Sequence, residues 1–168
     1  MSEYQGKTWF SSHLTDSTGG YSMATTATST ATKTFTLGPP PAGETWAVHR
    51  ILPFLQDGVN QRAEQYGALG AALTNGILLR VVGSTGNVVT DLLDGAPIKS
   101  NGDWANHCFD AELKEWGAGD EILSVRWTFA KAGIPLQLTS TEQLDCVIQD
   151  NLSALTEQTI IAQGYKDK

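Results

Sequence analysis

The chain has 168 residues and a mass of 18.0 kDa, which is enough length for one domain with a substantial hydrophobic core. Its formal net charge is −7 and its sequence pI is about 4.8. Lys and Arg residues are scattered singly, whereas nucleic-acid binders cluster them against phosphates, so we expect no nucleic-acid partner.

The start of the chain, MSEYQGKTWF, lacks the basic segment and apolar run of a secretory signal. No stretch of the sequence has the length and apolarity of a membrane span. We therefore expect a soluble protein that is made in the cytoplasm and has no membrane partner.

Residues 1–41 differ in composition from the rest of the chain. The run Ala24–Thr32 contains only Ala, Thr and Ser and has no helical period. Such a stretch buries too little apolar surface to offset the entropy lost on ordering. We predict an extended low-complexity arm over 1–41 that orders against a neighbouring subunit. Its aromatic side chains are the expected anchors of that contact: Trp9, Phe10, Tyr21 and Phe35.

A β-rich body is predicted over residues 42–168, after the stiff proline-rich hinge Gly38–Gly43. Short apolar or alternating segments in it are separated by Gly, Asn and Asp turns. The predicted strands are Glu44–Leu55, Ile77–Val82, Asn87–Leu93, Cys108–Glu115, Glu121–Ala130, Pro135–Thr139, Gln143–Gln149 and Thr159–Tyr165. Ser100–Asp103 favours the cap of a short helical turn through Trp104–His107. Because no long segment has a helical period, the sequence predicts an all-β fold, a single jelly-roll-like β-sandwich.

The stretch Glu121–Ala130, EILSVRWTFA, is the predicted central strand of the body. Residues two apart share one face of a strand, so this stretch pairs a bulky apolar face with a largely polar one. The apolar face is the predicted core contribution of this strand: Leu123, Val125, Trp127 and Phe129.

No stretch matches a phosphate-binding loop, a GxSxG nucleophile turn, an HExxH helix or an EF-hand loop. The three histidines, His13, His49 and His107, lack the His-x-His spacing of a cupin-type metal site. Cys108 and Cys146 lie in apolar segments, where cysteine behaves as a small hydrophobic residue. We therefore predict no catalytic residue, no metal and no cofactor.

Two groups of residues leave a ligand role open. Loop carboxylates can bind calcium in concert, although Asp is also the ordinary turn residue and solvated turns are the favoured interpretation. These carboxylates are Asp91, Asp94, Asp103, Asp110 and Asp120. Trp104 and Trp116 flank a loop region, where they would form either a carbohydrate platform or part of a core or subunit contact.

The segments Ala72–Val82, Trp116–Gly133 and Leu144–Leu155 resemble small virion proteins of tailed bacteriophages, the head decoration or cement proteins. The resemblance covers about Glu44–Tyr165 and rests on packing and turn patterns. It implies a β-sandwich that is present in many copies on the outer capsid surface of a virion. The implied partners are the major capsid protein and further copies of the chain, in a homo-oligomer, and no catalytic residues are implied.

The acidic composition, the arm and the missing catalytic motifs agree with such a structural, non-enzymatic role. A carbohydrate-binding sandwich, such as a module of a phage tail or fibre, is the alternative from another class, and a cupin-like metal enzyme comes third. Exposed coplanar Trp residues would favour the second function, and a pocket of converging His and carboxylate groups would favour the third.

Overall fold

Two antiparallel β-sheets form the protein in a computed structural model, which describes residues 6–24, 32–57, 61–67, 69–107, 110–115, 121–129 and 134–168. The strands are β1 (Lys7–His13), β2 (Lys33–Leu37), β3 (Thr45–Asp57), β4 (Ile77–Gly83), β5 (Val88–Asp91), β6 (Asp110–Glu115), β7 (Glu121–Thr128), β8 (Leu136–Leu138), β9 (Glu142–Ile148) and β10 (Glu157–Asp167). One short helix, α1 (Asn101–His107), accompanies them in the described part of the chain. The prediction of an all-β fold is confirmed.

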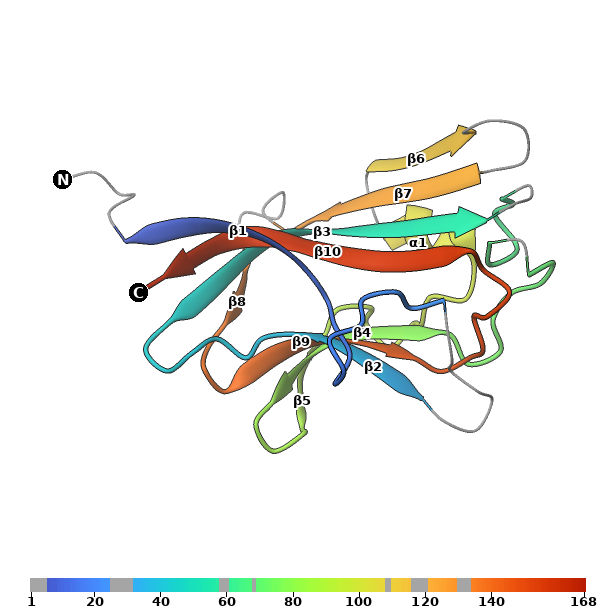
Figure 1. Cartoon of the computed structure of the whole chain (residues 1–168). Helices are drawn as coiled ribbons and strands as arrows, with labels where there is room; N and C mark the ends of the chain where they lie inside the picture. The colour runs from blue at the N-terminus through green and yellow to red at the C-terminus, as the bar shows by residue number, and fades with distance from the viewer. Residues whose placement is uncertain are drawn as a thin grey trace.

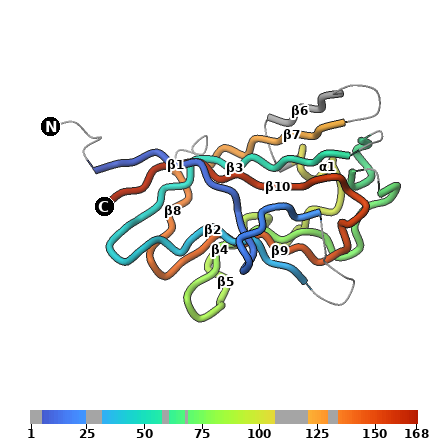
Figure 2. The backbone as a smooth tube through the Cα atoms, viewed as in Figure 1, coloured from blue at the N-terminus to red at the C-terminus, as the bar shows by residue number. Residues whose placement is uncertain are grey.

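The larger sheet has the strand order β1-β10-β3-β7-β6, and β8 pairs with the first part of β3. The smaller sheet has the order β2-β9-β4-β5. Figure 1 shows the two sheets as separate layers, and Figure 2 shows the chain descending from one layer to the other after β1. The strand Glu121–Thr128 lies between β3 and β6, and the most extensively paired strand of the sheet is β3, which contacts β10, β7 and β8.

Residues 6–24 and 32–41 belong to the body, which corrects the predicted boundary between an arm over 1–41 and a body over 42–168. β1 pairs with β10 along its whole length, and β2 pairs with β9. Between them, Leu14 and Met23 are buried in the core. The composition of the stretch concealed this, because two short alternating segments flank the Ala/Thr/Ser run and find their partner strands at the far end of the chain.

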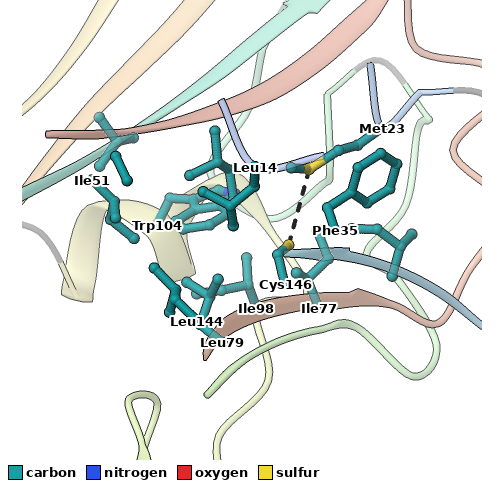
Figure 3. Close-up of a cluster of buried hydrophobic side chains, with 14 of the residues drawn as sticks. Leu14, Met23, Phe35, Ile51, Ile77, Leu79, Ile98, Trp104, Leu144 and Cys146 are labelled. Atoms are coloured by element: carbon teal, nitrogen blue, oxygen red, sulfur yellow. Dashed lines mark hydrogen bonds between the residues drawn. The ribbon is translucent and has the colours of Figure 1, made fainter. Parts of the chain in front are cut away.

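The core lies between the inner faces of the two sheets (Figure 3). Its largest fully buried side chains are Trp104, Tyr66, Phe35, Leu14, Met23, Ile51, Leu55, Ile77, Leu79, Leu93, Ile98 and Leu138. In β7, Leu123 and Val125 are buried and Trp127 is half-buried. Phe129, just after the end of the strand, is also half-buried, and the Trp127 and Phe129 rings pack against the core with their centroids 5.5 Å apart.

A chain of buried polar contacts crosses this core. The Trp104 indole N–H donates to the Tyr66 hydroxyl at 3.3 Å, and that hydroxyl donates to the side-chain carbonyl of Gln158. The Gln158 amide and the Cys146 thiol then both donate to the sulfur of Met23, at 3.7 and 3.9 Å. Because each of these polar groups finds a partner away from water, the network fixes α1, β9 and β10 against the segment that follows β1.

The predicted helical cap is confirmed at α1. The Asp103 N–H donates to the Ser100 hydroxyl at 3.2 Å, and the Asp103 carboxylate accepts the Ser100 N–H at 2.9 Å. This reciprocal pair satisfies backbone donors at the helix start. The cap holds Trp104 on the helix face that is fully buried.

Candidate interaction surface

The histidines and cysteines do not converge on one site in the described part of the chain. His13 and His49 each pack against a tyrosine ring, with centroids 4.6 Å from Tyr21 and 5.3 Å from Tyr165. The His107 side chain and all of Cys108 lie outside the described residues. No group of three or more His, Cys, Asp or Glu side chains there is arranged to hold a metal ion.

Two of the loop carboxylates considered for calcium accept hydrogen bonds from backbone groups. Asp91 and Asp103 each accept two backbone N–H groups, from the turn after β5 and from the start of α1. Asp94 lies in that turn with a φ of 53°. The Asp110 side chain and Asp120 are outside the described residues. The described carboxylates are thus turn and cap residues.

Of the two tryptophans considered for a carbohydrate platform, the structure describes Trp104. Trp104 is fully buried. Trp116 lies outside the described residues. Trp9 is half exposed, and its ring meets the Tyr165 ring at 76°, so these two rings do not form a coplanar platform.

Cys146 is expected to be chemically inert in the folded protein. Burial, together with the charge of Asp145, raises the pKa of the Cys146 thiol far above its ordinary value, so the reactive thiolate is scarcely populated. In a Cys108→Ser variant, we expect DTNB to react with this thiol only after unfolding in urea. Rapid reaction of the native variant at pH 8 would show that the side chain reaches solvent.

The four predicted anchor residues divide into two pairs. Phe10 and Phe35 point into the core of their own chain and are buried, so they are unable to dock onto a neighbouring subunit. Trp9 and Tyr21 are 48% and 49% exposed. Alternation along β1 explains the contrast, because Trp9 and Phe10 are adjacent and must face opposite sides of the sheet.

The outer side of the larger sheet, away from the core, carries the exposed aromatic side chains Trp9 and Phe54. We call this surface the β1–β10–β3 face, and its residues are Trp9, Ser11, His13, His49, Arg50, Leu52, Phe54, Ile161, Gln163 and Tyr165. Trp9 lies beside Tyr165 in register, with ring centroids 5.1 Å apart, and His49 contacts the same tyrosine. One end of the face is therefore an aromatic cluster built by three strands.

A polar row crosses the middle of the β1–β10–β3 face. The Arg50 Nε donates to the Gln163 side-chain carbonyl at 2.6 Å, and the Gln163 amide donates to the Ser11 hydroxyl at 3.2 Å. This row holds an arginine in a fixed orientation on the sheet surface. Beyond it, Leu52 pairs with Ile161 in register and Phe54 is 39% exposed.

These side chains are the kinds enriched in protein–protein contacts: aromatic residues and arginine with apolar neighbours. The described chain has no helix long and apolar enough to cross a membrane. Comparisons with protein-family models, with curated proteins and with solved structures find no match. The sequence analysis missed this face because its residues come from three separate strands, and only the strand register brings them together.

Proposed function

We propose that the chain is a non-enzymatic virion protein, most simply a capsid decoration protein that binds the major capsid protein and stabilises the head. The observation that carries the proposal is the β1–β10–β3 face, where Trp9 is exposed at one end and Phe54 is exposed at the other end, next to the Leu52–Ile161 pair. A rigid sheet that presents apolar and aromatic groups around a positioned arginine suits docking on another folded protein.

The strand pairing supports a jelly roll as the scaffold in this proposal. β1 pairs with β10, β2 with β9, β3 with β7 and β4 with β5, so the first of eight strands meets the last and each later pair is nested inside the previous one. A long hairpin rolled into two sheets has this order, and viral capsid domains use it. β6 and β8 are additions to the eight.

Binding to particles tests the proposal through a single substitution. Phe54→Asp places a charge beside Leu52 in the apolar end of the β1–β10–β3 face, and desolvating that charge against an apolar partner is costly. The particles come from a phage that encodes the chain, after deletion of its gene for the chain. We expect wild-type protein to rebind these particles and Phe54→Asp to bind at least roughly tenfold more weakly, the loss typical of one important interface contact.

Val88→Asp is the matched control, because Val88 is a similarly exposed apolar residue on β5 of the other sheet. It should rebind as well as the wild type. Absence of the chain from purified particles by mass spectrometry would contradict the virion assignment. Equal rebinding of Phe54→Asp and Val88→Asp would contradict the assignment of the docking face.

A further inference from the structure

An open hollow lies where the turn after β1 meets the starts of β2 and β10. Its volume is about 590 Å³, which is within the range of small-molecule sites. The lining residues are Asp16, Thr18, Gly19, Gly20, Tyr21, Ser22, Lys33, Thr156 and Glu157. Hydroxyl groups are the commonest polar groups in this lining, and one aromatic ring accompanies them.

Asp16 and Lys33 neutralise each other within the hollow. One Asp16 oxygen is 2.9 Å from the Lys33 amine, and the other accepts the N–H groups of Thr18 and Gly20 at 2.9 Å each. These contacts hold the pKa of Asp16 well below its ordinary value, with the Lys33 contact as the largest cause. The backbone donors of the turn are thus already occupied by a carboxylate of the chain itself, which leaves no site for an anionic ligand.

The groups that remain are Tyr21, Glu157, Ser22 and Thr156. The Tyr21 ring is half exposed and is steadied by the His13 ring, whose centroid is 4.6 Å away. Among the described residues, no hydrogen bond or ion pair engages the Glu157 carboxylate, although that side chain is half-buried. The Ser22 and Thr156 hydroxyls are likewise uncommitted within the described chain.

We propose that this hollow binds a neutral saccharide unit. A sugar ring offers an apolar C–H face for the Tyr21 ring and adjacent hydroxyls that donate to the two oxygens of the Glu157 carboxylate. The Ser22 and Thr156 hydroxyls complete a set of partners that can both donate and accept. A neutral ligand also suits this lining because its one cationic side chain, Lys33, is already paired with the carboxylate of Asp16.

The hollow borders the β1–β10–β3 face at His13, which packs against the Tyr21 ring, but neither Tyr21 nor Glu157 is among the residues that carry the docking proposal. A cationic side chain is the competing ligand, since it would use the same tyrosine ring and the same carboxylate. The two ligands differ in their dependence on salt, because attraction between unlike charges is screened and hydrogen bonding to a neutral sugar is not.

Amide chemical shifts of the full-length chain test the proposal. The probes are the methyl glycosides of glucose, galactose, mannose and N-acetylglucosamine, with acetyl-arginine methylamide as the cationic probe. We expect at least one glycoside to shift the amides of Gly19, Gly20 and Tyr21 at millimolar concentration, with an affinity that is unchanged by added salt. Tyr21→Ala and Glu157→Gln should each weaken that binding at least roughly tenfold, whereas Trp9→Ala should leave it unchanged.

Three results would overturn the saccharide site. The first is that none of the four glycosides shifts these amides. The second is that the arginine probe shifts them more strongly than any glycoside and in a salt-dependent way. The third is that a glycoside binds Tyr21→Ala as tightly as it binds the wild type. Because the experiment uses the isolated chain and measures residues outside the β1–β10–β3 face, its failure leaves the capsid-docking proposal untouched.

Discussion

Deletion of residues 1–41 is expected to abolish cooperative folding of the chain. The deletion removes both β1 and β2, so β10 and β9 each lose a hydrogen-bonded neighbour along one edge. It also removes five large buried apolar side chains from the core: Phe10, Leu14, Met23, Phe35 and Leu37. The remaining segment, 42–168, would have an incomplete pair of sheets.

The expected energetic loss exceeds what a domain of this size can tolerate. Removing a buried large apolar side chain costs about 2–5 kcal/mol, so five of them represent a loss on the order of 10 kcal/mol or more. The whole free energy of unfolding of a typical domain is only about 5–15 kcal/mol. We therefore expect residues 42–168 to show no cooperative thermal or urea transition by circular dichroism.

Adding a peptide of residues 6–41 in trans provides the control for this deletion. If β1 and β2 are strands of the body, the peptide should restore a cooperative transition, because it supplies both missing strands and their core side chains. A cooperative transition of 42–168 alone, at a melting temperature close to that of the full chain, would refute the structural role assigned to the two strands.

The sequence predicted the strands of the body because their information is local. Alternation in Glu121–Ala130 places Leu123 and Val125 on one face, and that face is buried from 121 to 125. Turn residues around the other strands marked their ends within a few positions, as at Ile77–Gly83. The short helical cap at Ser100 was predictable for the same reason, since both of its hydrogen bonds join Ser100 to Asp103, three residues further along the chain.

The role of the first 41 residues was hidden because it depends on distant partners. Lys33–Leu37 alternates apolar and polar residues, yet five residues are too few to separate a strand from a loop by pattern. Phe35 is buried because β9 lies beside it in register, with Cys146 as the opposite residue. No local pattern contains that pairing, and the neighbouring Ala/Thr/Ser run favoured an arm.

For the two candidate surfaces, too, single residues could be predicted from the sequence, whereas their neighbours could not. Trp9 was recognised as an anchor from its residue type alone, but Tyr165 and His49 become its neighbours only through the register of β1, β10 and β3. In the hollow, Glu157 joins Tyr21 although they lie at opposite ends of the chain. Residue types are therefore readable from the sequence, whereas their assembly into a surface depends on the sheet.

Gly164→Ala is expected to be among the most destabilising single substitutions in the chain. Gly164 lies in β10 where the register with β3 shifts, so that Gln163 pairs with Arg50 and Gly164 pairs with Val48. At this irregularity the two backbones approach unusually closely. A methyl group added at Gly164 would overlap the backbone oxygen of Ala47 and lie 2.9 Å from the Val48 Cα.

Relief of this overlap requires movement of the backbone. Neither atom that blocks the methyl group belongs to a side chain that can rotate away, so β3 and β10 must separate and lose pairing that also supports the β1–β10–β3 face. Inserting extra methylene groups into a well-packed core lowers the free energy of unfolding by about 1–3 kcal/mol. We expect the loss for Gly164→Ala to reach or exceed the upper end of that range, because the clash is with the backbone of a neighbouring strand. A urea titration should therefore show a midpoint well below that of the wild type.

Gly86→Ala provides the matched control for Gly164→Ala, because it is the same substitution at a glycine with open space around it. Gly86 has a φ of 79°, and an added Cβ there would have no other atom within 4 Å. The expected loss in the free energy of unfolding is about 1–2 kcal/mol, because alanine is strained in the left-handed backbone conformation and no other contact is disturbed. If the two variants lose equal stability, the close approach of β3 and β10 at Gly164 is not present in solution. A clearly lower urea midpoint for Gly164→Ala than for Gly86→Ala is the outcome that the register shift between β3 and β10 predicts.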